Sequence, residues 1–211
     1  MDSLIIRKII RRSRTATLIL SDRRRVMLDN EVLFKAGLGV GEEITYSRLE
    51  NLSRDSAQRV AADYALYLLS RRNYSSGLLR RKLIEKGQEP RIISTVIANL
   101  TAKGFLDDRR YARRTAESIL ARKPAGKKFL TAYLRTKLIP RTLAEEVVDE
   151  VFQDEDETAL ALRLLQPRLK QLAKFELETA RTKAYNYLSR RAISYRAAKE
   201  AFEILRKEMG N

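Results

Sequence analysis

A repeat of about 50 residues limits the possible folds of this sequence more than any other feature. Six positions with small or apolar residues recur 51 positions further along the chain, and again after another 54. The three sets are Leu79, Leu83, Ile93, Val96, Ile97 and Leu100; Leu130, Leu134, Ala144, Val147, Val148 and Val151; and Ala184, Leu188, Ala198, Ala201, Phe202 and Leu205. Their spacing of three and four residues is that of one face of a helix. The repeat therefore predicts an array of helical units that bury their apolar faces against their neighbours.

We predict three tandem three-helix units, which span residues 55–106, 107–153 and 154–211. Their first helices are expected over residues 57–70, 109–120 and 160–172. Pro167 should kink or end the third of these helices, because proline lacks a backbone donor and its ring crowds the preceding turn. Asp107 and Ser194 are placed to cap helices. Pro90 and Pro140 stand where third helices are expected to begin, a position that suits proline.

Residues 1–54 differ from the repeats, and we predict that they form a small extension that contains β-structure. Segments rich in β-branched residues and leucine, at residues 4–10, 15–20 and 26–28, are expected to form two or three short strands. A short helix follows from Asn30 to Ala36, with Gly37 as its left-handed stop. The glycine-rich stretch after it predicts a turn, because its spacing is not that of a phosphate-binding loop and two glutamates follow it. The expected fold is mostly α, with three tandem three-helix units in a curved array after this extension.

The chain contains no cysteine and no histidine. Disulfides, thiolate nucleophiles and zinc-thiolate sites are therefore excluded, and the commonest general base and transition-metal ligand is absent. The acidic run Asp154–Glu157 is expected to cap a helix rather than to hold a metal ion, because adjacent side chains diverge and acids favour a helix N-terminus. We expect a protein that is not an enzyme, with no catalytic residue, no metal and no cofactor.

No apolar run approaches the roughly 20 residues that a membrane span requires. The N-terminal cluster Leu4–Ile6 is cut off by Arg7 and Lys8 and is too short for the apolar core of a signal peptide. We therefore expect a soluble cytoplasmic protein.

The charge balance indicates a polyanionic partner. Lysine and arginine number 43 against 27 acidic residues, a formal net charge of +16, and every quarter of the chain is positive. Such a field attracts nucleic acid or a nucleoprotein. The alternative is a solvated surface that only aids solubility.

The candidate binding residues lie on the same predicted helices as the core residues, so that a helix can bury its leucines and expose its cations. They are Arg71, Arg72, Arg80, Arg81, Lys82, Lys86, Arg109, Arg110, Arg113, Arg114, Lys127, Lys128, Arg135 and Lys137. Each phosphate that they neutralise would release a condensed counterion, so affinity should fall steeply with salt. Some of them can instead pair with Glu85, Glu117 or Asp149. Tyr74, next to Arg71 and Arg72, is a candidate for stacking on a base.

Three stretches of the sequence resemble the RecX family, the regulators of the bacterial recombinase RecA. Gly104–Ala112, which reads GFLDDRRYA, resembles the family's junction between its first two units. Leu79–Gly87 is similar to its second helix, and Val32–Leu38 with Gly41 and Ile44 resembles the extension of its longer members.

Three positions depart from the family pattern. Leu78 stands where the family often has a glutamate, so the capping-box partner of Ser75 is absent. Leu138 and Ala192 stand where a glycine often follows the basic residue, so these helix ends are expected to stop without the usual left-handed glycine. Pro140 is expected to end the helix in the second unit.

The resemblance implies a non-enzymatic modulator that lodges in the groove of a RecA filament on single-stranded DNA. Such proteins inhibit the ATPase and recombinase activity of the filament by blocking its extension or promoting its disassembly, and so regulate recombination, DNA repair and the SOS response. The implied partners are the RecA filament and single-stranded DNA, with no membrane, and the free protein is expected to be monomeric.

Two other classes stay open on the sequence. Three-helix units also build helix-turn-helix proteins, whose recognition helices would begin at Pro90–Arg91 and Arg141–Thr142. A nuclease that uses carboxylates and a metal ion would need acidic residues that converge in space.

Overall fold

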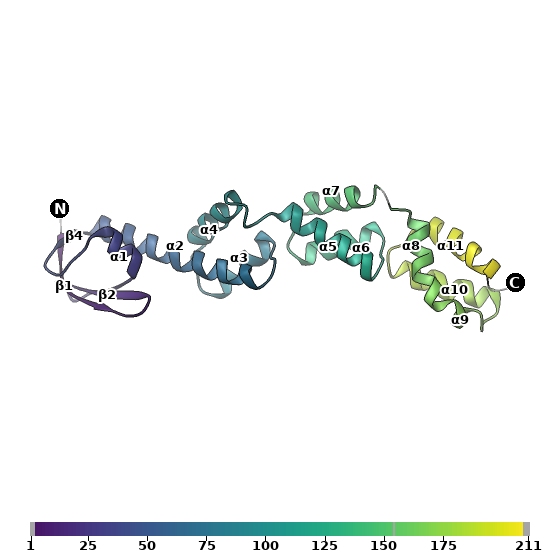
Figure 1. Ribbon diagram of the computed structural model, residues 1–211, viewed down its shortest axis with the longest axis horizontal. Coiled ribbons are helices and arrows are strands. Elements are labelled where there is room, and N and C mark those ends of the chain that lie inside the picture. Colours follow the sequence, from purple (N-terminus) through teal and green to yellow (C-terminus); the bar gives the residue numbers. More distant parts are fainter. Residues whose placement is uncertain (1–2, 154, 209–211) are drawn as a thin grey trace. The chain divides into compact units, whose positions relative to one another are not determined.

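The computed structural model describes residues 3–153 and 155–208, and it divides into two compact units (Figure 1). The first unit comprises Met1–Tyr74 and Leu78–Leu106, and the second comprises Ser75–Gly77 and Asp107–Asn211. Among the described residues, no helix is both long enough and apolar enough to cross a membrane.

The first unit begins with a four-stranded antiparallel sheet. Its strands are β1 (Ser3–Arg11), β2 (Thr15–Leu20), β3 (Arg25–Asp29) and β4 (Glu43–Thr45), in the order β3-β2-β1-β4. The sequence predicted two or three strands and missed β4, because a strand of three residues is too short to show alternation. The short helix α1 (Asn30–Ala36) is as predicted, with Gly37 left-handed at a φ of 67°. The apolar face of the sheet packs with this helix in one core cluster.

Helix α2 (Tyr46–Arg71) is 26 residues long and begins eleven residues before the helix predicted at residue 57. The boundary predicted between residues 54 and 55 therefore lies inside a continuous helix. The segment has no glycine or proline to interrupt it, and Thr45 caps its first turn by accepting from the N–H of Arg48. Leu49 belongs to the core of the sheet, whereas Ala61 and Ala65 pack with α3 (Ser76–Glu85) and α4 (Pro90–Ala102).

The second unit contains the other two predicted repeats. Its helices are α5 (Asp108–Arg122), α6 (Lys127–Thr136), α7 (Arg141–Val151), α8 (Glu157–Leu165), α9 (Leu169–Leu172), α10 (Leu177–Ser189) and α11 (Tyr195–Glu208). One cluster of buried residues runs from Ala112 to Leu205 through all of this unit. Pro167 ends α8 as predicted and lies in a 3₁₀ turn, Gln166–Arg168.

Several predicted helix ends are confirmed. The expectation that Pro140 ends the helix in the second unit is wrong, because α6 already ends at Thr136 and Pro140 directly precedes α7. Asp107 caps α5, and the Ser194 hydroxyl accepts from the N–H of Ala197 at the start of α11. Leu138 and Ala192 adopt the left-handed conformation themselves, at φ values of 58° and 54°. These helix ends therefore keep the usual geometry without glycine, and each accepts the steric cost of a Cβ there.

Gly126 is the residue before α6, and it lies directly against the loop that joins α10 to α11. Its N–H donates to the carbonyl of Arg191 at 2.8 Å, and a Cβ on Gly126 would collide with the carbonyl oxygen of Ala192. Because both partners are backbone atoms, neither can rotate away. Glycine at this position therefore sets how closely α6 approaches that loop.

We expect Gly126→Ala to lower the free energy of unfolding by about 1–3 kcal/mol, the usual cost of overpacking a closed site. Urea unfolding followed by circular dichroism measures the change. Gly39→Ala is the matched control, because the atoms nearest to a Cβ there are side-chain atoms of Glu42 at 4.0 Å. Equal stability of the two variants would contradict the assignment of a close backbone contact at Gly126.

Candidate nucleic-acid interface

In the first unit half of the candidate cations lie on α3, which buries Leu79 and Leu83 and turns its basic residues outward. Arg81 and Lys82 share the carboxylate of Glu85, at 3.9 and 2.6 Å. The hydrogen bond from Lys82 is the main reason why the pKa of Glu85 lies below its ordinary value. Arg80 instead donates to the hydroxyl of Ser94 at 3.3 Å and takes part in none of the ion pairs among the described residues.

Three other cations of this unit cover tyrosine rings. Arg71 lies over Tyr67 at 5.4 Å, Arg72 over Tyr74 at 4.5 Å, and Lys86 over Tyr64 at 5.5 Å from the ring centroid. Such contacts fix the direction of a long side chain without neutralising its charge.

The prediction that Tyr74 stacks on a base is wrong. Its side chain is only 7% exposed, and the guanidinium of Arg72 lies over its ring, so no base can reach that face. Tyr67 is 54% exposed, and the sequence analysis did not single out its contact with Arg71. The usable signal was a tyrosine four residues before a cation near a helix end, the spacing that places Tyr67 beneath Arg71.

In the second unit two cations of α5 are engaged with α7. The guanidinium of Arg109 pairs with Glu146 at 2.5 Å and also with Glu150, and that of Arg113 pairs with Glu150 at 2.9 Å. Arg110 lies 4.0 Å from Asp107, the residue that caps α5. Arg109 and Arg113 therefore hold α5 against α7, a role that the sequence could not separate from ligand binding.

Helix α6 carries candidate cations that are not engaged in ion pairs among the described residues. Lys128 and Arg135 are exposed and belong to none of the ion pairs in the described part of the chain, and Arg114 on α5 shares this property. Lys137 lies over the ring of Tyr133 at 4.7 Å, and Tyr133 stacks with Phe129 at 6.4 Å. Lys127, by contrast, pairs with Asp149 at 2.7 Å.

Two residues of the acidic run that the sequence assigned to a helix start, Asp156 and Glu157, lie there. Asp156 caps α8 by accepting from the N–H of Thr158 at 2.8 Å, and Glu157 accepts from the N–H and the hydroxyl of Ser194. Asp154 lies outside the described residues. Within the described ranges, no three acidic side chains converge in a way that could hold a metal ion.

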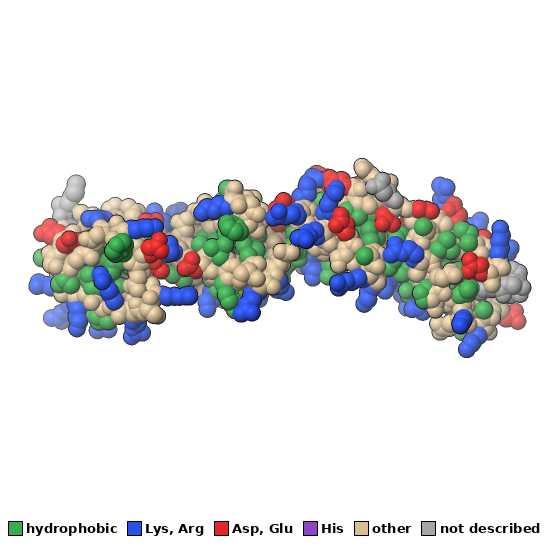
Figure 2. Space-filling model, viewed as in Figure 1, with side chains coloured by type: hydrophobic (Ala, Val, Ile, Leu, Met, Phe, Trp, Pro, Cys, Tyr) green, Lys and Arg blue, Asp and Glu red, His purple; other side chains and the backbone are tan. Residues whose placement is uncertain are grey.

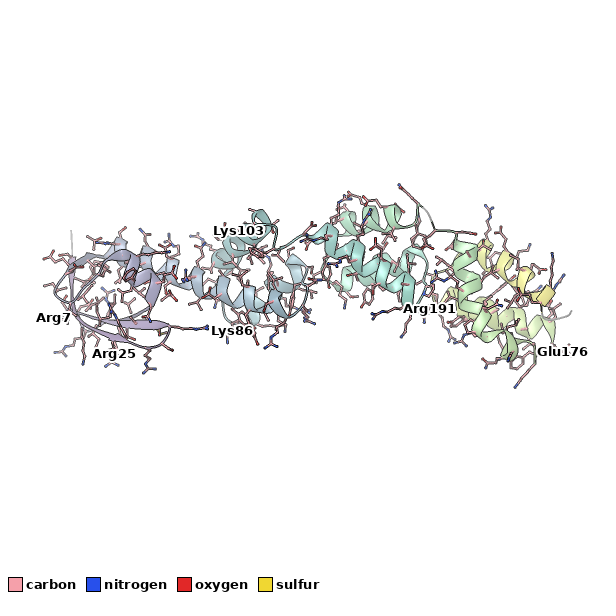
Figure 3. The ribbon with its side chains drawn as sticks, viewed as in Figure 1. Arg7, Arg25, Lys86, Lys103, Glu176 and Arg191 are labelled. Carbon is pink, nitrogen blue, oxygen red and sulfur yellow. The ribbon has the colours of Figure 1, made fainter. Side chains whose placement is uncertain are left out.

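Both units therefore combine helices with buried leucines and cations that are partly paired and partly exposed. Figure 2 shows basic side chains spread over each unit, with acidic ones interspersed, and Figure 3 shows the side chains as they leave the helices. This arrangement is that of a basic helical-repeat protein.

Comparisons with known proteins identify the family. The family profile described as RecX, first three-helix domain, matches residues 61–100. The regulatory protein RecX of Pelodictyon phaeoclathratiforme is 31% identical over 145 residues, which cover 69% of this chain and 88% of that protein. The RecX of Thermus thermophilus is 34% identical over 149 residues, which cover 70% and 94%. The chain belongs to the RecX family of regulatory proteins, which are non-enzymatic regulators.

A crystal structure of a regulatory protein RecX has the same fold. It superposes with a TM-score of 0.73 at 18% identity and covers 95% of this chain and 99% of that structure. The structure of RecX from Lactobacillus salivarius gives a TM-score of 0.66 over 72% of this chain. The likeness thus extends over both the N-terminal sheet and the helical repeats.

The pairing of α5 with α7 predicts a dependence of stability on pH. Hydrogen bonds from Arg113 and then Arg109 lower the pKa of Glu150 below its ordinary value. A carboxylate with a lowered pKa stabilises the folded state above its unfolded-state pKa, and that contribution is lost as the pH falls through the folded-state pKa. We expect Glu150→Gln to lose stability less steeply than the parent chain between about pH 5 and about pH 3.

Thermal unfolding measured across that pH range tests this expectation. Glu117→Gln is the control, because Glu117 lies exposed on α5 and takes part in none of the ion pairs among the described residues. If Glu150→Gln and Glu117→Gln changed the loss of stability at low pH equally, the ion pairs of Glu150 with Arg109 and Arg113 would not contribute to stability.

Proposed function

We propose that this protein binds the RecA filament on single-stranded DNA and inhibits its ATPase and recombinase activity without catalysing a reaction. The inhibition arises from blocked extension or promoted disassembly of the filament. The observation that carries the proposal is the set of exposed cations on α3 and α6 that take part in none of the described ion pairs, in a chain that belongs to a family of regulatory proteins.

The physics of these helices supports a role in binding phosphates. Leu79 and Leu83 of α3, and Leu130 and Leu134 of α6, are fully buried, so each helix is held rigidly with its basic face outward. A cation that is already oriented loses little side-chain entropy when it meets a phosphate. Each such contact also releases counterions from the DNA.

The structure gives the helix-turn-helix alternative little support. At the start of α7, where a recognition helix would need free donors, Arg141 pairs with Glu145 on its own helix at 2.7 Å. At the start of α4, Arg91 is exposed, and its backbone carbonyl accepts from the hydroxyl of Thr95. Generic binding to DNA is a separate outcome of the experiments below.

Single-stranded-DNA-stimulated ATP hydrolysis by the cognate RecA, titrated with this protein at two salt concentrations, tests the proposal. We expect inhibition well below one molecule per RecA subunit, because a regulator that acts on filament growth need not cover the filament. Inhibition only at amounts that coat the DNA, and abolished by added salt, would indicate a generic competitor instead.

Charge reversal at the exposed cations tests which surface acts. We expect Arg80→Glu, Lys128→Glu and Arg135→Glu together to raise the half-inhibitory concentration at least tenfold, since each lost phosphate contact costs roughly fivefold at about 0.1 M salt. Lys170→Glu, Lys174→Glu and Lys199→Glu change the charge equally and are the matched control. Arg109 and Arg113 are unsuitable for this test, because they also hold α5 against α7. If the Arg80, Lys128 and Arg135 variant still inhibited fully, the exposed cations of α3 and α6 would not be the inhibitory surface.

A further inference from the structure

A β-bulge in β1 reverses which side chains face the core of the N-terminal sheet. Ile6 lies opposite Leu20 and Lys8 lies opposite Ile19, so Arg7 is an extra residue between them. Before the bulge, Leu4 and Ile6 are buried; after it, the even-numbered residues are exposed instead. A bulge shifts strand register by one, and so turns the following side chains to the other face. Without it Lys8 and Ile10 would point into the core.

The outer face of this sheet therefore has two cross-strand rows. Paired residues of an antiparallel sheet project from the same face, so one row is Lys8, Ile19 and Arg25, and the other is Ile10, Thr17 and Met27. Ile10 is 41% exposed and Met27 is 66% exposed. The opposite face of the sheet packs in one cluster with residues of α1 and α2.

The outer face and its rim are densely basic. Residues 7–25 contain eight cations, Arg7, Lys8, Arg11, Arg12, Arg14, Arg23, Arg24 and Arg25, and one acid, Asp22. Asp22 pairs with Arg24, whose guanidinium also lies over the ring of Tyr46 at 4.7 Å. None of the ion pairs in the described part of the chain involves the other seven cations. Figure 3 shows Arg7 and Arg25 on the side of the sheet away from α1 and α2.

We propose that this outer face is a second nucleic-acid-binding surface, specific for single-stranded DNA and separate from the cations of α3 and α6. Cations such as Lys8 and Arg25 flank an apolar strip of Ile10, Ile19 and Met27. The charge is complementary to phosphates, and the strip is complementary to unstacked bases. A duplex buries the faces of its bases and presents mainly phosphates and polar groove edges, so it leaves the strip uncovered.

The residues of the outer face also indicate that it does not select a particular base sequence. The strands β1, β2 and β3 contain no aromatic side chain, so their outer face does not offer the ring stacking that many single-strand binders use. The bases contact aliphatic side chains, which do not distinguish them by hydrogen bonds. The surface therefore binds single strands of different sequence with similar affinity.

Fluorescence anisotropy with a labelled oligothymidine tests the charges, with the full chain carrying Arg7→Gln, Lys8→Gln and Arg25→Gln. Three lost phosphate contacts should reduce the slope of log affinity against log salt by about 2, and the affinity roughly 100-fold at about 0.1 M salt. Lys170→Gln, Lys174→Gln and Lys199→Gln remove the same charge elsewhere and should leave the slope nearly unchanged. An equal loss in the two variants would show a general charge effect and overturn the proposal.

A second pair of substitutions tests the apolar strip independently of charge. Ile10→Ser with Met27→Ser should weaken binding of oligothymidine severalfold and leave duplex binding and the salt slope unchanged. A photo-crosslinking amino acid at position 27, in an otherwise unaltered chain, should crosslink to oligothymidine even if a charge variant folds poorly. No crosslink at saturating oligothymidine would overturn the proposal.

A third possible result is that the outer face of the sheet binds an acidic protein surface instead of DNA. If the Arg7, Lys8 and Arg25 variant binds oligothymidine normally but loses binding to RecA without DNA, the face binds protein and the proposal is wrong. The proposal does not rest on the action of the protein on RecA. The oligothymidine-binding measurements involve no ATPase assay, so they can succeed or fail independently of the test of inhibition through α3 and α6.

Discussion

Burial of one narrow apolar stripe on each helix is the constraint on which the rest of the molecule depends. Leu79 and Leu83 on α3, and Leu130 and Leu134 on α6, are fully inaccessible to solvent. Each such side chain contributes about 1.5–3 kcal/mol on burial. Because the stripe occupies little of each helix surface, all other faces stay outside, and a chain with a net charge of +16 must display its cations there. The basic surface is therefore a consequence of how the core is built.

The cations on that surface have two different roles, which depend on what lies opposite them. Arg109 and Arg113 meet Glu150 across the α5–α7 contact and hold two helices together. Lys128 and Arg135 belong to none of the described ion pairs and stay available for a ligand. An exposed ion pair adds little stability by itself, but it sets the direction of both side chains and reduces the charge that a polyanion meets. The set of cations that are free of ion pairs among the described residues is thus smaller than the count of basic residues suggests.

The N-terminal sheet shows the same separation between core and surface by a different device. In a regular strand, alternation would place every second residue of β1 in the core. The bulge at Arg7 interrupts that alternation, so that a single strand contributes Ile6 to the core and Lys8 to the outer face. A two-residue period searched along the sequence does not reveal this, because the pattern changes phase in the middle of the strand.

The sequence by itself determined the repeat of apolar residues, the basic character, most helix ends and, through GFLDDRRYA, the family. These features are local, because helix faces, caps and prolines act within a few residues. Only the tertiary structure decided which cations are paired, that Tyr74 is covered, and that the second and third predicted repeats share one core. It also decided that Leu138 and Ala192 take the left-handed conformation that glycine usually supplies. Each of these depends on residues brought together from distant parts of the chain or on a backbone cost that packing offsets. Local sequence patterns contain no information about either.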